Sequence, residues 1–178
     1  MRAGQDIVLT GWTGLAGTLA IIQIKDSELK ERFAPFFLKQ IKGYAGEMHT
    51  EEELMPESAQ AVVREVGEGG IFAALWRLAK ESGTGMTVDM KRISIRQETI
   101  EICEFYRLNP YQLYSGGSFL VITDDGQKMS EELGRRGIFS SVIGRLTDSN
   151  DKIIRNGEEI RFIDRPAPDE IEKVYKII

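Results

Sequence analysis

The sequence has few of the residues that form disulfides or bind metal ions in a small protein. It contains one cysteine, Cys103, and one histidine, His49, in 178 residues. A single cysteine excludes an internal disulfide, and the pair leaves too few soft ligands for a structural zinc site. No apolar run approaches the roughly 18 residues of a membrane span, and residues 1–6 lack the order of a signal peptide. These absences predict a soluble, cytoplasmic protein without a membrane partner.

The chain also has fewer positively than negatively charged side chains. The chain has 23 Lys and Arg against 28 Asp and Glu, a net charge of -5. A negative chain is disfavoured as a general binder of phosphate backbones, so we expect no nucleic-acid partner. The hydrophobic content of 42% suffices for one core, and a chain of this length removes roughly 70% of its unfolded surface from water. Residues 1–178 are therefore expected to form a single domain.

Apolar periodicity predicts a mixture of helices and strands. Ile71, Ala74, Leu75, Leu78 and Ala79 follow the i, i+3, i+4 spacing of one helical stripe. The same spacing around residues 99–106 places Cys103 in the core. Further helices are expected at 19–24, 28–33, 35 to about 43 or 48, 125–136 and near 168, and strands at 6–12, 86–90, 118–123, 138–146, 152–154 and 159–163. The last two strands flank Asn156-Gly157, a hairpin signal.

This order predicts an α+β fold, one mixed sheet covered by helices. The most informative stretch of the sequence is residues 65–70. Before it, Pro56 is expected to interrupt regular structure, and Ser58 is expected to cap the segment that leads into this stretch.

Glycines gather at three junctions between predicted elements. Such glycines let the backbone approach a ligand and direct free N–H groups at an anion. The candidate ligand-binding residues are Gly11, Gly14, Gly17, Glu65, Glu68, Gly69, Gly70, Ser115, Gly116 and Gly117. We expect them to converge on one concave face, because ligands collect where loops and helix N-termini meet. The alternative is that the glycines only cap and turn, and that Glu68 is a solvated residue favoured by a helix dipole.

Other candidate sites are weaker. His49 lies among Glu47, Glu51, Glu52 and Glu53, but such a charge run is typical of a solvated face, and we predict no metal site. Trp12, Tyr111 and Tyr114 either stack on a base or pack beside the turns. The glycine spacing from Gly11 to Gly17 differs from the dinucleotide-binding fingerprint, and no acidic strand end follows at the right distance.

The motifs in order carry a resemblance that covers Gly4 to about Ile163. They are a strand with Gly-x-x-Gly-x-x-Gly, then Glu-Gly-Gly-Ile-Phe-Ala-Ala-Leu-Trp, Ser-Gly-x-Gly before a strand, Ser-Gly-Gly-Ser-Phe-Leu-Val, and Gly-Ile-Phe-Ser-Ser-Val-Ile-Gly-Arg-Leu. This series resembles the C-terminal domain of the AIR (aminoimidazole ribonucleotide) synthase-related superfamily, closest to hydrogenase maturation factor (carbamoyl dehydratase)-like proteins. Thiamine-monophosphate kinase and selenophosphate synthetase are more distant relatives.

The resemblance implies chemistry in which ATP activates a substrate oxygen. In two-domain relatives an N-terminal domain binds the nucleotide and Mg²⁺ and builds the dimer, and this sequence carries no counterpart of it. The C-terminal domain supplies the opposing wall, with an Asp-x-Thr/Ser-x-Gly-Gly type loop. Here Glu65 replaces the aspartate and Gly67 the hydroxyl residue. The terminal cysteine of the maturation factor, which accepts the carbamoyl group, is also missing from residues 173–178.

The expected function is therefore the C-terminal half of an ATP-dependent AIR synthase-like protein, inactive alone. ATP and Mg²⁺ belong to the full-length family context, and no cofactor is expected for this chain alone. The expected partners are the missing N-terminal domain and a possible second copy of the chain. The alternative is a stand-alone binding or assembly module that keeps the fold without catalysis. Neither interpretation identifies catalytic residues or a substrate.

Overall fold

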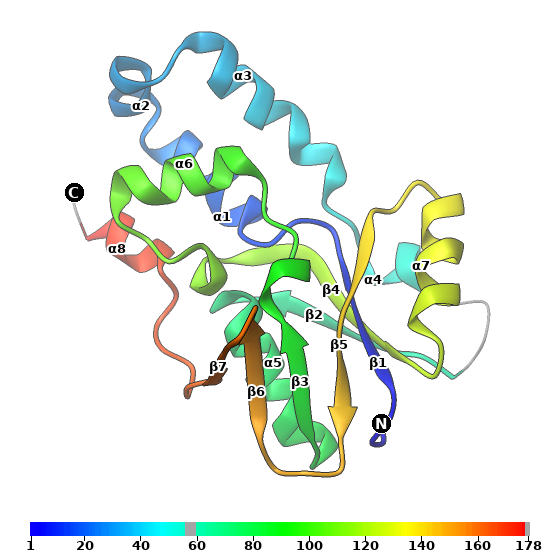
Figure 1. Cartoon of the computed structure of the whole chain (residues 1–178). Helices are drawn as coiled ribbons and strands as arrows, with labels where there is room; N and C mark the ends of the chain where they lie inside the picture. Colours follow the sequence, from blue (N-terminus) through cyan, green and yellow to red (C-terminus); the bar gives the residue numbers. More distant parts are fainter. Residues whose placement is uncertain (56–59, 177–178) are drawn as a thin grey trace.

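A mixed sheet is the scaffold of the computed structural model, which describes residues 1–55 and 60–176 (Figure 1). Within these residues the sheet has seven strands in the order β2-β4-β1-β5-β3-β6-β7. The strands are β1 (Asp6–Thr10), β2 (Val62–Gly67), β3 (Gly85–Asp89), β4 (Ser115–Thr123), β5 (Ser140–Thr147), β6 (Lys152–Asn156) and β7 (Glu159–Phe162). Strands β3 and β6 pair in parallel, and the other neighbours are antiparallel. The predicted α+β class is confirmed.

The register of three neighbouring strands determines where the glycine-bearing segments lie. Thr10 at the end of β1 pairs with Phe119 of β4, and Glu65 of β2 pairs with the same residue. Because both pairings are antiparallel, β1 and β2 end where β4 begins. The residues that follow β1 and β2 and those that start β4 therefore share one end of the sheet.

Helices cover both faces of the sheet and one of its ends. They are α1 (Leu15–Ile24), α2 (Asp26–Arg32), α3 (Pro35–Gly43), α4 (Glu51–Leu54), α5 (Gly70–Ser82), α6 (Gln97–Tyr106), α7 (Gly126–Arg135) and α8 (Ile171–Tyr175), with short 3₁₀ turns η1 (Tyr44–Glu47), η2 (Met90–Arg92) and η3 (Pro110–Gln112). No helix of the described residues is both long and apolar enough to cross a membrane.

Three apolar clusters follow from this arrangement. Strand residues alternate between the two faces, so Ile7 and Leu9 of β1 pack with the α5 stripe while Val8 packs with α7 and α4. The third cluster joins α1, α2, α3, α6 and α8, which gather beyond one end of the sheet, and it contains Cys103 (Figure 1). Leu75 is 0% exposed and Cys103 is 1% exposed, so both core predictions are confirmed.

Several predicted boundaries differ from the structure. The first strand ends at Thr10 and α1 begins at Leu15, so Gly17 lies inside a helix. Ser115, Gly116 and Gly117 belong to β4 and do not form a loop before it. Strand β2 was not predicted, because its exposed Arg64 and Glu65 interrupt the apolar pattern. The predicted hairpin at Asn156-Gly157 is confirmed as the β6–β7 pair, and Pro56 and Ser58 lie outside the described residues.

Candidate ligand-binding site

The three glycine-bearing segments meet at the shared end of β1, β2 and β4. The Gly14 N–H donates to Ser115 Oγ at 2.7 Å, and the Gly17 N–H donates to the Tyr114 carbonyl at 2.9 Å. The Gly117 N–H donates to Glu65 Oε1 at 3.2 Å. Segments up to 101 residues apart in sequence are thus joined directly by hydrogen bonds. That the candidate residues converge on one concave face stays a prediction. We call this region the glycine junction; that it binds a ligand stays a prediction.

Five glycine N–H groups of the junction have partners within the chain. Besides the three bonds above, the Gly11 N–H donates to the Phe139 carbonyl at 2.9 Å, and the Gly69 N–H donates to Asp169 Oδ2 at 2.6 Å. The expectation that these segments present free donors was therefore wrong for five of their glycines. An anion that used these donors would have to displace a hydrogen bond of the folded chain.

The carboxylate of Asp169 occupies the N-terminal end of α5. Its Oδ2 accepts from Gly69, the N-cap of that helix, and its Oδ1 accepts from the N–H groups of Tyr114 at 3.1 Å and Ile171 at 3.0 Å. Asp169 is only 4% exposed. The positive end of a helix dipole and three N–H donors stabilise a buried carboxylate. The segment after β7, residues 163–176, which we call the tail, thus places a carboxylate of the chain itself at the helix end where a ligand anion was expected.

Glu170 fastens the tail beside this contact. Its Oε2 accepts from the Asn109 N–H at 3.0 Å, and both carboxylate oxygens accept from Lys173 Nζ at 2.8 Å. Its own N–H donates to the Gln112 carbonyl at 3.2 Å. Neither Asp169 nor Glu170 was predicted as part of a site, because an acidic pair after a proline is indistinguishable from a solvated segment until its partners are known.

Two of the predicted glycines are required by close packing. A Cβ added to Gly17 would lie 2.5 Å from Leu113 Cγ, and one added to Gly70 would lie 2.5 Å from the Tyr111 carbonyl oxygen. These contacts hold α1 against the segment that leads into β4, and α5 against η3. For these two positions the structure provides a packing role, whether or not a ligand binds.

The predicted glutamates have different surroundings. Glu65 lies in β2 and bridges to β4 through Gly117. Glu68 is exposed, and only its backbone carbonyl makes a described bond, to Arg77 Nη1 at 3.0 Å. The solvated interpretation of the Glu68 side chain agrees with this exposure.

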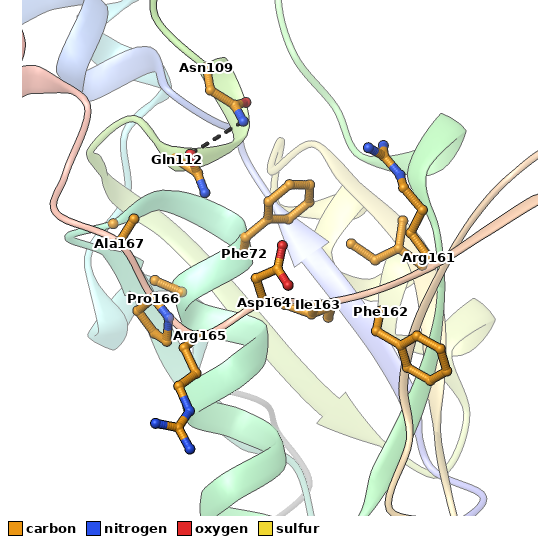
Figure 2. Close-up of a pocket in the computed structure, with 13 residues that line it drawn as sticks. Phe72, Asn109, Gln112, Arg161, Phe162, Ile163, Asp164, Arg165, Pro166 and Ala167 are labelled. Atoms are coloured by element: carbon orange, nitrogen blue, oxygen red, sulfur yellow. Dashed lines mark hydrogen bonds between the residues drawn. The ribbon is translucent and has the colours of Figure 1, made fainter.

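One cavity opens on the Gly69 side of the junction. It has a volume of about 170 Å³ and is lined by Gly69, Phe72, Ala73, Asn109, Gln112, Ile154 and residues 161–167 (Figure 2). Phe72 stacks on Tyr111 with 5.2 Å between ring centroids. Burial raises the pKa of the Tyr111 hydroxyl, which keeps the ring neutral. Tyr111 therefore packs against its neighbours in this structure.

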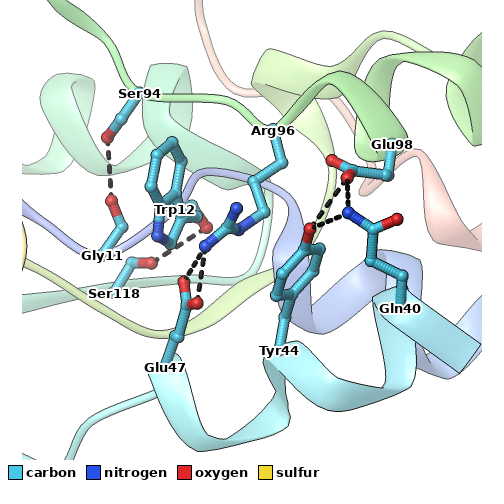
Figure 3. Close-up of polar contacts among 9 residues, drawn as sticks. All are labelled: Gly11, Trp12, Gln40, Tyr44, Glu47, Ser94, Arg96, Glu98 and Ser118. Atoms are coloured by element: carbon cyan, nitrogen blue, oxygen red, sulfur yellow. Dashed lines mark hydrogen bonds and ion pairs between the residues drawn. The ribbon is translucent and has the colours of Figure 1, made fainter.

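A second cavity, of about 270 Å³, opens on the Gly11 side and is lined by Gly11, Trp12, Gly46, Glu47, His49, Arg96, Gly137 and Phe139. Trp12 stacks on Phe139 at 4.5 Å on one face, and its ring centroid lies 4.2 Å from Arg96 Cζ. Arg96 also lies over Tyr44 and forms an ion pair with Glu47 (Figure 3). Since Trp12 already has two stacking partners, packing is its observed role.

The two cavities are separate, and neither is lined by Ser115, Gly116 or Gly117. The acidic run around His49 is also dispersed. Glu47 binds Arg96, whereas Glu53 closes a capping box on α4 and lies 3.4 Å from His49 Nδ1. Residues 1–55 and 60–176 contain no group of three or more His, Cys, Asp or Glu side chains arranged to hold a metal ion.

Comparison with known proteins identifies the class of domain to which this mixed sheet and its glycine junction belong. Residues 2–156 match the family described as AIR synthase related protein, C-terminal domain, and the chain belongs to this family. Phosphoribosylformylglycinamidine synthase subunit PurL of Methanopyrus kandleri is 25% identical over 175 residues, 89% of this chain and 22% of that protein. Carbamoyl dehydratase HypE of Rhodobacter capsulatus is 26% identical over 86 residues, 46% of this chain and 25% of that protein.

Solved structures share the fold. The structure of hydrogenase maturation protein HypE in complex with ATP superposes with a TM-score of 0.70 at 17% identity, covering 96% of this chain and 53% of that one. The chain thus spans about half of that HypE chain, and 22% and 25% of the lengths of PurL and carbamoyl dehydratase HypE named above.

Proposed function

We propose that this chain supplies the C-terminal half of an ATP-dependent AIR synthase-like protein related to the hydrogenase maturation factor. In this proposal the glycine junction forms one wall of a site for nucleotide and substrate phosphate, and the other half of the protein forms the opposing wall. The observation that carries the proposal is the superposition on the ATP-bound HypE structure. The superposed part covers 96% of this chain but only 53% of that HypE chain.

We infer that residues 1–55 and 60–176 do not complete an ATP–Mg²⁺ site by themselves. Five glycine N–H groups of the junction are paired internally, and the Asp169 carboxylate occupies the helix end where a phosphate would bind. Magnesium prefers carboxylate and water oxygens in octahedral geometry, and no such carboxylate group exists among the described residues. We therefore assign nucleotide and metal binding to the other half and expect this chain alone to be inactive.

In this proposal the cysteine of this chain does not act as a carbamoyl acceptor. A carbamoyl acceptor must be an accessible thiol, but the only cysteine is Cys103, which is 1% exposed. Burial raises the pKa of its thiol to about 12, so little nucleophilic thiolate forms near neutral pH. Glu65 and Gly67, which replace the family's aspartate and hydroxyl residue, are further departures from the family's pattern.

A second candidate function is a stand-alone binding or assembly module without catalysis. The observation that favours it is the internal pairing of the junction's donors, above all the burial of Asp169 against Gly69. A domain that no longer meets phosphate gains stability from satisfying these N–H groups itself.

The coding DNA upstream of Met1 separates the two candidates. A continuous reading frame that encodes Asp-rich metal motifs supports the enzyme half, and its longer product should then release phosphate from Mg-ATP steadily. Absence of such a frame, or a longer product that neither binds nor hydrolyses ATP, would favour the stand-alone module.

A further inference from the structure

Among the described residues, part of the sheet is open on the face that carries α7. Met86 and Val88 of β3 pack in the α5 cluster together with Ile154 of β6. Because strand residues alternate, Thr87 and Arg155 face the opposite side. There α7 packs against β1, β4 and β5. An open hollow of about 580 Å³ lies next to it, lined by residues of β3, β5, β6 and η2.

Positive side chains dominate this hollow. Lys91, Arg92, Arg145 and Arg155 line it, against the two carboxylates Asp6 and Asp89. The carboxylates are already engaged: Arg145 Nη2 lies 2.8 Å from Asp6 Oδ1, and Arg92 Nε lies 3.5 Å from Asp89 Oδ2.

Lys91 and Arg155 have no ion-pair partner among the described residues, although Arg155 is the register partner of Asp89. The hollow therefore has a surplus of two positive charges in a chain whose net charge is -5.

The two unpaired cations come from elements that pack together, since η2 carries Lys91 and contacts β6. Arg155 is in β6, and the turn after that strand brings Gly157 close to Lys91. A Cβ added to Gly157 would lie 3.4 Å from Lys91 Nζ, an ordinary van der Waals distance, so the Lys91 side chain lies against this turn. Gly144 of β5 likewise contributes no side chain to the lining. Two positions of the open hollow thus carry no side chain that would fill it.

We propose that this hollow binds a small phosphorylated molecule whose phosphate is held by Lys91 and Arg155, with Arg92 and Arg145 beside it. An arginine fork and a lysine ammonium are the side chains that recognise phosphate oxygens. The volume falls in the range of small-molecule sites. A phosphomonoester fits better than a nucleic acid, whose backbone would meet the repulsion of the chain's net negative charge.

This site is distinct from the glycine junction and does not depend on the function proposed above. Asp6 at the start of β1 lines the hollow, whereas the junction begins after Thr10 at the other end of that strand. A strand of this length separates its ends by about 13 Å. Amide signals from Gly144 and Gly157 therefore report on the hollow, and those from Gly14 and Gly69 report on the junction.

Titration of the ¹⁵N-labelled chain with inorganic phosphate and with pyrophosphate tests the proposal. We expect saturable shifts of the Gly144 and Gly157 amides. The double variant Lys91→Gln/Arg155→Gln should bind at least about tenfold more weakly, since it loses two charge-assisted contacts. The matched control Lys39→Gln/Arg135→Gln removes the same charge from exposed positions on α3 and α7, and should change the affinity less than about twofold.

Several outcomes would overturn the proposal: absence of saturation, shifts confined to Gly14 and Gly69, or equal weakening in both double variants. Binding to a single-stranded oligonucleotide that tightens with its length would instead make the hollow a nucleic-acid interface. Thermal unfolding of each variant checks its folding, and the single variants Lys91→Gln and Arg155→Gln are measured if either double variant is destabilised.

Discussion

At the scale of single residues, the junction depends on the buried carboxylate of Asp169, which accepts three backbone N–H groups from separate segments. The tail therefore determines the conformation of loops that lie far from it in sequence. Its position also explains why the end of α5 needs no side-chain cap of its own.

Replacing Asp169 by asparagine should destabilise the fold by about 1–3 kcal/mol, because the amide NH₂ would face a buried N–H donor and leave it unpaired. Urea unfolding measures this change. The control is Asp164→Asn in the same tail, where the side chain is exposed and the expected change is within about 0.5 kcal/mol. Equal effects of the two substitutions would show that the Asp169 contacts contribute little.

Cys103 provides a pH-dependent test of the core. Burial raises the pKa of its thiol from 9.0 to about 12, and the charge of Glu170 acts in the same direction. In the unfolded chain the thiol loses its proton at the lower value, so the folded state binds more protons above pH 9. Stability should therefore be unaffected by this group below pH 9 and should fall as the pH rises toward 12.

The free energy of unfolding of the wild type and of Cys103→Ala, measured by urea between pH 8 and 11, separates this contribution from the other titrating groups. We expect the wild type to lose more stability across that interval than the variant does. Parallel pH profiles would contradict a buried, protonated thiol.

At the scale of elements, α1 is placed by the contact of Gly17 with the residues before β4. Gly17→Ala should cost about 1–3 kcal/mol through overpacking, although alanine is the better helix former. Gly134 of α7 is the matched control, because no atom lies within 4 Å of its added Cβ, and Gly134→Ala should stabilise by roughly 0.5–1 kcal/mol. Chemical denaturation gives both values, and a stabilising Gly17→Ala would refute the packing role.

Strand β2 illustrates why an element that depends on pairing with a distant strand was missed. The apolar stripe on α5 is a local pattern and was predicted correctly from the spacing of its residues alone. The pairing of β2 with β4 is not local, since Val63 and Val121 are partners across the sheet. The same pairing extends β4 back to Ser115, where the glycines had suggested a loop.

At the scale of the whole molecule, residues 2–156 match one domain family, and the compared proteins extend well beyond this chain. If the other half holds the nucleotide, the isolated chain of 178 residues should bind Mg-ATP weakly and hydrolyse none. Isothermal titration calorimetry and a phosphate-release assay measure this. A sub-micromolar dissociation constant or steady phosphate release by the chain alone would contradict the proposed division of labour.

The amino-acid sequence by itself determined the α+β class, the buried stripe of α5, the burial of Cys103 and the β6–β7 hairpin. These properties follow from local periodicity, turn residues and the order of motifs. Only the tertiary structure decided which partners the glycine N–H groups have and that Asp169 occupies the end of α5. It also brought Lys91 and Arg155 into the lining of one hollow. Such contacts join residues far apart in the chain, and no local pattern encodes which donor a folded backbone brings to which acceptor.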